Sequence, residues 1–360
     1  MSTFDICEEL SIFKIVSQTL IDITNEIVNN IPKKQKFKNI YYQVAKWYMY
    51  NLGVDCDRKI PMMFKTYVID ELRTDILNTT QYDMESSPEL LETIAKHVKS
   101  CNEQIRSVQK QSHCNYEIRN IDNRLVYVPD DPERNRYHVN INEKLHQKLI
   151  DTYEGPKDQI DEHIFALLLR YTLYGSKKST ISLSVNFVYD NPKVLNKVKL
   201  EVELFGSPVN RNLERFCSLF PDIEQHWGSI GSFFCLSDEY FKKYRYFVSN
   251  PPYTNTVMAE SSQKIVDILD RIEECCFIVT IPDWRPEAGL EGGKYSDVPY
   301  EAYDILKASP HLKIDRSYSG NFTYTDYFKS KDYTIGSTGT IIMVLSNFDI
   351  PLEHSDFDLE

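Results

Sequence analysis

Hydrophobic residues in the first third of the chain recur every three or four positions, which is the spacing of an amphipathic helix. This pattern predicts helices over residues 4–28, 37–52 and 88–112. Pro88 directly after Ser87 is typical of a helix start, because a proline at the first helical position gives up no helical hydrogen bond. We therefore expect a helical layer in this part of the chain, without a catalytic motif.

The pattern changes after residue 112. Residues 124–128 form a short run of strand-forming side chains, and Pro-Asp-Asp-Pro at 129–132 predicts a turn, with a domain boundary at 130/131. Helical spacing returns over residues 143–153 and 162–174. Residues 181–189 alternate as a strand does, but a helix fits them as well.

Strands alternate with helices from residue 197 onward. Helical spacing predicts helices over residues 212–219 and 257–275, and the Ser, Tyr and Gly content of residues 318–338 predicts a loop. Apolar runs predict strands over residues 199–205, 232–236, 244–248, 276–281, 311–317 and 339–346. Such alternation is typical of a wound, mostly parallel sheet, so we expect an α/β fold over residues 131–360 with a helical domain over residues 1–130 before it.

The tetrad Asn250-Pro251-Pro252-Tyr253 ends the strand predicted over residues 244–248 and precedes a predicted helix. A loop in that position lies at the carboxyl edge of the sheet, where α/β proteins bind ligands. Asn-Pro and Pro-Pro are also common in ordinary turns, so a plain strand-ending turn is the alternative interpretation.

The four residue types of the tetrad suit the binding of an exocyclic amine. An adenine amino nitrogen is a poor nucleophile, because its lone pair is delocalised into the ring. The carbonyls of the Asn250 side chain and the Pro251 backbone can accept hydrogen bonds from its two N–H groups. This redirects the lone pair of the nitrogen towards an electrophilic methyl group. Pro251 and Pro252 keep the loop rigid, and Tyr253 offers a ring on which the base can stack.

A methyl donor would need its own loop, normally after the first strand of such a sheet. Phe205-Gly206-Ser207-Pro208-Val209-Asn210 follows the strand predicted over residues 199–205. It lacks the G-x-G-x-x-G pattern, so an ordinary strand–helix turn remains the alternative. Glu203 and Asp222 are acidic groups suited to the ribose or the amino acid part of a donor, although a solvated acid is the default interpretation of each.

Charge and cysteine content narrow the classes of protein further. The net charge of −12 argues against a protein that coats nucleic acid over its whole surface, because phosphate binding requires Lys and Arg. Cations could still act locally at three places: Lys33, Lys34, Lys36 and Lys38; Lys177 and Lys178; and Lys242, Lys243 and Arg245. The eight cysteines show no paired zinc spacing, so we expect reduced thiols and no metal.

Apolar runs in the chain are short. None reaches the length of about 18 residues that a membrane span requires, and the first residues do not resemble a secretory signal. We therefore expect a soluble intracellular protein with no membrane partner; the sequence does not decide between nucleus and cytoplasm.

Five sequence blocks follow one another in a recognisable order. They are residues 203–210 (ELFGSPVN), 215–222 (RFCSLFPD), 227–229 (WGS), 250–253 (NPPY) and 277–285 (FIVTIPDWR). This succession resembles the phosphorylated CTD-interacting factor family, the cap-specific adenosine N6-methyltransferases, and the resemblance covers roughly residues 160–350. No WW module is recognisable at the amino end, so the chain resembles a form of the family without that module.

The resemblance implies a Rossmann-like class I methyltransferase sheet, S-adenosylmethionine as donor, and a first transcribed adenosine beside an m7G-capped mRNA 5′ end as substrate. The helical domain would then support RNA binding. Asn250, Pro251, Pro252 and Tyr253 would be catalytic; a second group, after or near the first strand, would bind the donor, namely Glu203, Phe205, Gly206, Ser207, Pro208, Asn210 and Asp222. A third group would face the substrate, namely Asn255, Asp283, Trp284 and Arg285.

Two differences from the family pattern affect the expected specificity. Tyr253 stands where animal members usually have Phe, a change that keeps the stacking ring. Thr254 and Asn255 lack the acidic group expected after the tetrad. A DNA adenine methyltransferase and a catalytically silent RNA-binding subunit are the alternatives, and the intact tetrad argues against the second.

Overall fold

The computed structural model describes residues 5–31, 36–53, 56, 62–64, 69–80, 82–108, 115–130, 138–173, 183–184, 186–285, 300–318, 322–326, 331–335 and 339–358. The chain divides into two compact units, Met1–Ser179 and Thr180–Glu360. Each unit has its own secondary structure and is described by itself.

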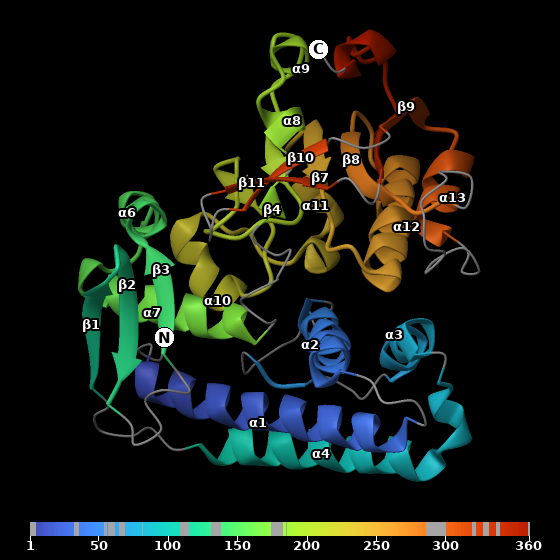
Figure 1. Cartoon of the computed structure of the whole chain (residues 1–360). Coiled ribbons are helices and arrows are strands. Elements are labelled where there is room, and N and C mark those ends of the chain that lie inside the picture. The colour runs from blue at the N-terminus through green and yellow to red at the C-terminus, as the bar shows by residue number, and fades with distance from the viewer. Residues whose placement is uncertain are drawn as a thin grey trace. The chain divides into compact units, whose positions relative to one another are not determined.

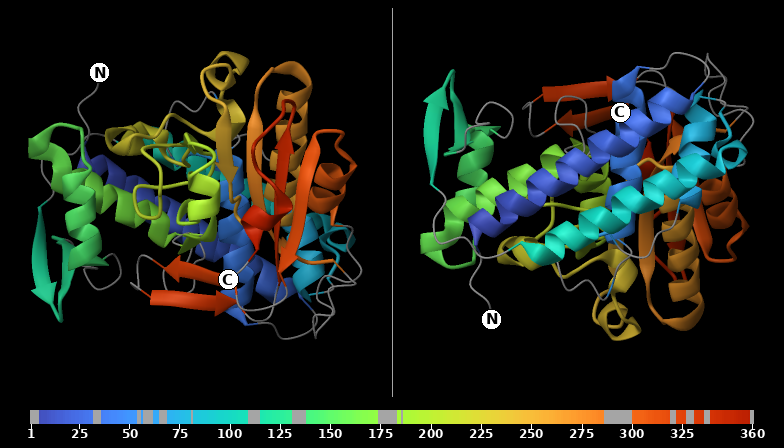
Figure 2. Two further views of the ribbon diagram at one scale, coloured as in Figure 1. Left: turned by 90° about the horizontal axis from the view of Figure 1, so that it is seen from above. Right: turned by 90° about the horizontal axis from the view of Figure 1, so that it is seen from below.

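Helices dominate the first unit. Its α-helices are α1 (Ile6–Asn30), α2 (Phe37–Gly53), α3 (Asp70–Thr80), α4 (Pro88–Ser107), α6 (Glu143–Asp151) and α7 (Ile160–Thr172), with short 3-10 turns η1 (Met84–Ser86) and η2 (Lys157–Gln159). Asp5 caps α1 by accepting a hydrogen bond from the backbone N–H of Cys7 at 2.9 Å. The long helices α1 and α4 lie side by side (Figures 1 and 2). The predicted helices of this region are confirmed, and α3 is an additional one.

A small antiparallel sheet completes the first unit. It consists of β1 (Tyr116–Ile121), β2 (Arg124–Pro129) and β3 (Val139–Asn142), in that order. Asp122 and Asn123 make the β1–β2 turn with φ of 51° and 60°, the left-handed region that such two-residue turns require.

The first unit extends beyond the predicted boundary at 130/131. β3 pairs with β2, and Arg170 of α7 binds Glu9 of α1, so both later elements belong to the first unit. The boundary between the compact units therefore follows residue 179. Sequence pattern placed it too early, because the predicted boundary falls between β2 and β3, which pair with each other, rather than between two cores.

The second unit is built on a six-stranded sheet in the order β6-β5-β7-β8-β12-β9. The strands are β5 (Val202–Glu203), β6 (Arg215–Phe216), β7 (Tyr246–Ser249), β8 (Cys276–Asp283), β9 (Leu312–Tyr318) and β12 (Gly339–Ser346). β6, β5, β7 and β8 are parallel to one another, whereas β12 runs antiparallel to both β8 and β9. Figure 2 shows the long strands of this sheet side by side.

Both faces of the sheet are covered by apolar clusters. One cluster joins alternate residues of the strands, such as Phe277 and Met343, to the apolar side of α12 (Asn255–Arg271) and to α13 (Glu301–Ala308). The other joins the intervening residues, such as Ile278 and Val344, to the segments that contain α8 (Asn186–Tyr189), α9 (Pro192–Leu195) and η7 (His354–Phe357). All eight residues of β8 and of β12 are buried, as expected for central strands covered on both faces.

A three-stranded sheet of order β11-β10-β4 accompanies the main sheet. It contains β4 (Leu183–Ser184), β10 (Phe322–Asp326) and β11 (Lys331–Ile335). The prediction that residues 318–338 form a loop is therefore wrong for β10 and β11, because their Tyr- and Thr-containing sequences pair with each other across a short connection. Residues 181–189, for which two alternatives were open, contain both a strand (β4) and a short helix (α8).

Two further predictions in the second unit are wrong. The helix predicted over residues 212–219 is instead an extended segment with β6, and the strand predicted over residues 232–236 is a 3-10 turn, η5 (Phe233–Cys235). Both segments are too short for a periodic pattern to decide, and β6 is a strand only because β5 lies beside it. The remaining short helices are α10 (Pro221–Glu224), η4 (Gln225–Trp227) and α11 (Asp238–Phe241).

The cysteines do not all follow the prediction of reduced thiols. Cys101, Cys217, Cys275 and Cys276 are free and buried, whereas Cys7, Cys56 and Cys235 are disulfide-bonded. The prediction of reduced thiols is therefore wrong for these three cysteines. Within the described ranges, no helix is long and apolar enough to cross a membrane.

Candidate active site

The predicted donor loop and the tetrad follow two neighbouring strands. β5 and β7 pair in parallel, with Glu203 opposite Val248, so their carboxyl ends meet at one edge. β8 lies parallel on the other side of β7. The loop of residues 205–210, the tetrad and residues 284–285 therefore follow three adjacent strands at the same edge, which we call the site edge.

The strand order reverses at the site edge. From β5 the chain passes to β6 on one side and then to β7 on the other side. Ligands of open α/β sheets bind at such a reversal, outside the carboxyl ends of the strands. The positions predicted for donor and amine binding thus lie where this topology favours a ligand.

Hydrogen bonds within the loop of residues 205–210 hold it as a tight turn. The Asn210 side-chain oxygen accepts from the Ser207 backbone N–H at 2.9 Å and from its hydroxyl at 2.8 Å, and the Ser207 carbonyl accepts from the Arg211 N–H at 2.9 Å. Ser207, Pro208 and Asn210 are buried. These hydrogen bonds shape the loop.

Gly206 and Phe205 define the rest of this loop. The Gly206 N–H donates to the Cys217 carbonyl at 2.8 Å, and a Cβ at Gly206 would lie 3.0 Å from the Cβ of Phe216. A side chain at position 206 would therefore crowd Phe216 on β6. The Phe205 ring is half-buried and packs edge-on against Phe233, with ring centroids 5.4 Å apart.

The two acids considered for donor binding lie in different surroundings. Glu203 is 3% exposed, and its carboxylate accepts hydrogen bonds from the backbone N–H groups of Asn212 at 2.9 Å and Leu213 at 3.4 Å. Asp222 is half-buried in α10, shortly after the carboxyl end of β6. Glu203 therefore fixes the connection from β5 to β6, whereas Asp222 lies beyond the end of β6.

The tetrad joins β7 directly to α12. Thr254 caps α12 by accepting from the Val257 N–H at 3.2 Å, and its own N–H donates to the Pro252 carbonyl at 2.7 Å. Pro251 is buried, whereas Pro252 is exposed. The predicted order of strand, stiff loop and helix is confirmed. Asn255 is the first residue of α12 and is half-buried.

Asn250 and Tyr253 are hydrogen-bonded to each other. The Tyr253 hydroxyl donates to the Asn250 side-chain oxygen at 3.1 Å and lies 2.9 Å from the hydroxyl of Tyr324, which lies 3.0 Å from the Thr340 hydroxyl. Burial raises the pKa of Tyr253 well above its usual value, and the neighbouring Tyr324 raises it further. Tyr253 therefore stays a neutral phenol at physiological pH. Sequence reasoning missed Tyr324 and Thr340, because no local motif marks them.

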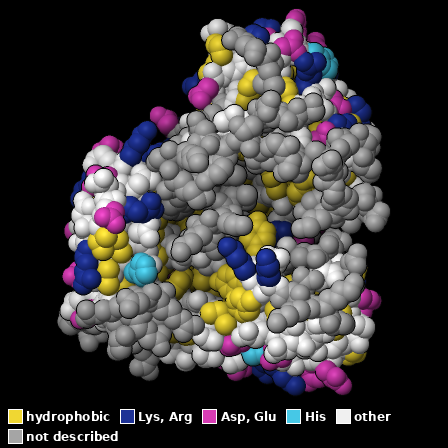
Figure 3. All heavy atoms as spheres, viewed as in Figure 1, with side chains coloured by type: hydrophobic (Ala, Val, Ile, Leu, Met, Phe, Trp, Pro, Cys, Tyr) yellow, Lys and Arg dark blue, Asp and Glu magenta, His cyan; other side chains and the backbone are white. Residues whose placement is uncertain are grey.

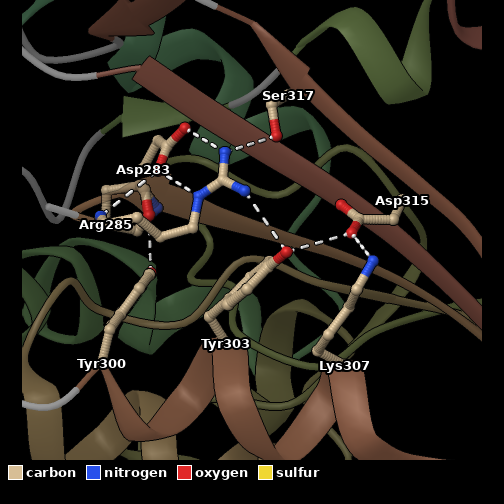
Figure 4. A network of polar contacts seen from close by, with 8 residues as sticks. Asp283, Arg285, Tyr300, Tyr303, Lys307, Asp315 and Ser317 are labelled. Atoms are coloured by element: carbon tan, nitrogen blue, oxygen red, sulfur yellow. Dashed lines mark hydrogen bonds and ion pairs between the residues drawn. The ribbon is translucent and has the colours of Figure 1, made fainter. Parts of the chain in front are cut away.

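Arg285 is bound within a network rather than directed at solvent (Figure 4). Its guanidinium forms two hydrogen bonds to the Asp283 carboxylate, at 2.8 and 2.7 Å, and one to the Ser317 hydroxyl at 2.8 Å. It also lies over the Tyr303 ring, 4.8 Å from its centroid. The phosphate or cap contact expected for Arg285 would have to compete with these partners.

Asp283 and Trp284 are also held by their neighbours. Asp283 is 5% exposed, and its carboxylate forms an ion pair with the Arg285 guanidinium. The half-buried Trp284 ring contacts Tyr300 at a centroid distance of 5.9 Å, and the Tyr300 hydroxyl donates to the Pro282 carbonyl at 2.6 Å. This corner of the site edge is therefore a rigid wall built from β8, β9 and α13.

Replacing Arg285 by Ala is expected to lower stability by ~1.5–3 kcal/mol, because the Asp283 carboxylate would lose its charged hydrogen-bond partner in a mostly buried place. Thermal melting of the full chain measures this loss. Arg316→Ala, which removes an Arg from the more exposed ion pair with Asp358, is the matched control and should change stability little. An unchanged melting temperature together with a raised KM for RNA would instead make Arg285 a substrate contact.

The predicted cation groups are only partly described. Lys33, Lys34, Lys177 and Lys178 lie outside the described residues. Upstream of the tetrad, Lys242 pairs with Glu239 at 2.5 Å and Arg245 pairs with Glu274. These ion pairs reduce the positive potential of that group. In the described part of the chain, no set of three His, Cys, Asp or Glu residues is arranged to hold a metal ion.

Fold and site together define an α/β protein whose candidate site lies at a strand-order reversal. Residues 143–300 match a family model described as the phosphorylated CTD interacting factor 1 WW domain. The matched region includes the loop of residues 205–210, the tetrad and residues 283–285.

Two curated relatives show where the similarity is strongest. A mouse (Mus musculus) and a human (Homo sapiens) protein, each named mRNA (2'-O-methyladenosine-N(6)-)-methyltransferase, are 34% identical to the chain over 84 residues. This alignment covers 23% of the chain and 11% of each relative. The chain thus matches only a small part of the length of these relatives.

Proposed function

We propose that this chain is an S-adenosylmethionine-dependent methyltransferase that modifies N6 of an adenosine at the 5′ end of capped mRNA. The observation that carries the proposal is the position of Asn250-Pro251-Pro252-Tyr253 beside the loop of residues 205–210 at the site edge. The match to the family model and the names of the two relatives support the same reaction.

The strand order supports a class I methyltransferase sheet. Four parallel strands on one side of the sheet provide the reversal between β5 and β7, and the antiparallel β12 lies between β8 and β9. Helices cover both faces, as a Rossmann-like sheet requires. The first unit would be the preceding helical domain that supports RNA binding.

The residues at the site edge fit a nucleoside-bearing donor. Phe205 offers a partly exposed ring at the end of β5, and Asp222 offers a carboxylate after β6 that could accept hydrogen bonds from ribose hydroxyls. Gly206 keeps the backbone free of a side chain at the same place. S-adenosylmethionine, when bound, supplies a methyl group on a positively charged sulfur.

The tetrad would activate the amine by hydrogen bonding alone. The side-chain carbonyl of Asn250 and the backbone carbonyl of Pro251 would accept hydrogen bonds from the two N–H groups of the adenine amine. The lone pair of the amine nitrogen would then point out of the base plane. Pro251 and Pro252 fix the backbone, so the carbonyls need little rearrangement on binding. The ring of Tyr253 stacks on the base, and an unpaired adenosine can enter without opening a duplex.

RNA would be held by local contacts. On the face in Figure 3, Lys and Arg side chains lie in small groups among Asp and Glu side chains. The net charge of −12 likewise disfavours binding over a broad surface. We therefore expect recognition of a short single-stranded end rather than of a long duplex.

Turnover with labelled donor distinguishes the alternatives. Capped RNA that begins with adenosine, the same RNA without a cap, and a single-stranded DNA of the same sequence are compared. Methylation of capped RNA above the other two supports the proposal. Preference for DNA would establish a DNA adenine methyltransferase, and RNA binding without turnover of any substrate would establish a silent subunit.

Replacing Tyr253 by Ala is expected to lower turnover about tenfold or more, because base stacking contributes roughly 1–3 kcal/mol. Tyr253→Phe keeps the ring and loses only the hydroxyl that binds Asn250, so its activity should lie between those of wild type and the Ala variant. Steady-state rates on capped RNA measure both variants. Equal rates for wild type, the Ala variant and the Phe variant would remove stacking from the mechanism.

A further inference from the structure

The chain of hydrogen bonds behind the tetrad links three separate parts of the second unit. It runs from Asn250 and Tyr253, after β7, to Tyr324 on β10 and Thr340 on β12, over distances of 3.1, 2.9 and 3.0 Å. Tyr324 is 2% exposed and Thr340 is 1% exposed. Two buried side chains from later strands thus support the tetrad from within the fold, Tyr324 by direct contact and Thr340 through Tyr324.

The number of hydroxyl protons gives this series of hydrogen bonds one direction. The side-chain oxygen of Asn250 can only accept, so Tyr253 uses its single hydroxyl proton there. Tyr253 must then accept from the Tyr324 hydroxyl, and Tyr324 must accept from Thr340. Every hydroxyl therefore donates towards Asn250.

The direction matters because an amide side chain can be turned by half a rotation at little cost. A turned Asn250 would place its NH₂ group where the amine needs an acceptor. The Tyr253 hydroxyl favours the orientation with the oxygen in that place, and this oxygen keeps a second lone pair for the amine N–H. The hydrogen bond selects the productive orientation as long as Tyr324 donates to Tyr253, because a Tyr253 hydroxyl without that donor could accept from the NH₂ group instead.

We propose that Tyr324 and Thr340 are positioning residues for methyl transfer, which orient the Asn250 carbonyl through the Tyr253 hydroxyl. This inference rests on the proposed function and assigns a role to two residues outside the tetrad. Tyr324 also contacts the Tyr253 ring edge-on, with centroids 6.3 Å apart and planes at 84°, so it fixes the stacking ring as well.

The series of hydrogen bonds ends at Thr340, which lies in the main sheet. Thr340 on β12 pairs with Pro282 on β8 and with Tyr318 on β9. Burial raises the pKa of Tyr324, as it does that of Tyr253, so both phenols remain protonated and act as hydrogen-bond donors rather than as bases. A rigid sheet position thereby determines the orientation of a side chain at the site edge.

The test is Tyr324→Phe, which removes the hydroxyl and keeps the ring. We expect kcat on capped adenosine RNA to fall roughly 3- to 10-fold, the range that one neutral hydrogen bond represents, while KM for RNA and donor affinity stay unchanged. Thr340→Val should lower kcat in the same direction, and Thr340→Ser, which retains a hydroxyl, should restore most of it. Tyr318→Phe removes another buried phenol hydrogen bond, to the Phe357 carbonyl, and should leave kcat unchanged.

A double-mutant cycle separates positioning from general destabilisation. Because Tyr324 acts through Tyr253, the Tyr253→Phe/Tyr324→Phe protein should be no slower than the Tyr253→Phe protein alone. Additive losses, or an unchanged kcat in Tyr324→Phe, would overturn the inference while wild-type turnover still supports the proposed function. Absence of wild-type turnover on every substrate would overturn the proposed function itself.

Discussion

Asn250→Ala is expected to lower methyl transfer by roughly 10²–10³-fold, the loss typical of removing one preorganised hydrogen-bonding group from a reacting centre. The variant lacks the side-chain oxygen that would accept an amine N–H, so the lone pair would stay in the ring. Labelled-donor turnover on capped adenosine RNA measures the loss. Calorimetry should show that donor affinity persists, because the loop of residues 205–210 is untouched.

The exposed Asn196 provides the matched control, since Asn196→Ala removes an amide side chain beyond α9 at the surface of the same unit. This variant should turn over like wild type. Full activity of Asn250→Ala would mean that the backbone carbonyls of the tetrad suffice or that the amine binds elsewhere. Loss of donor binding would instead point to a folding defect.

Glu9→Ala is expected to destabilise the first unit by about 3–5 kcal/mol, because it leaves a buried guanidinium without its carboxylate. Arg170 and Glu9 are joined by hydrogen bonds of 2.7 and 2.8 Å, and their side chains are 1% and 6% exposed. Chemical denaturation followed by circular dichroism measures the shift in midpoint.

Two further proteins test the cause of that loss. Glu8→Ala removes a neighbouring, half-buried carboxylate and should change the midpoint little. A Glu9→Met/Arg170→Met double replacement should recover part of the stability, because it leaves no unpaired charge in the core. A midpoint that Glu9→Ala leaves unchanged would show that the ion pair contributes nothing to the fold.

Long periodic segments were predictable from the sequence. The helices α1, α2 and α4 and the strands β8 and β12 follow the hydrophobic pattern, because each is long enough for one buried face, or two, to leave a regular signal. β6 and η5 were predicted wrongly, since each has only two or three residues and depends on its neighbours. The end of the first unit was also missed, because β3 and α7 join it through contacts with earlier parts of the chain.

The site was predictable in its position more than in its contacts. A strand, a stiff loop and a helix placed Asn250 at the carboxyl end of β7, and the same logic placed Phe205 after β5. The sequence could not show that Glu203 and Arg285 have close partners within the protein, or that Tyr324 lies behind Tyr253. These contacts depend on segments far apart in the chain.

The reversed direction of β12 brings a late segment of the chain to the candidate site. Its first residue, Gly339, lies opposite Asp283, and a Cβ there would come within 2.7 Å of the Tyr318 carbonyl oxygen. A premature stop codon or a protease cut just before Gly339 would spare every sequence block by which the family is recognised. The shortened product would nevertheless lack a central strand and the support behind the tetrad. A chain can therefore carry every sequence motif and still lack an intact candidate site.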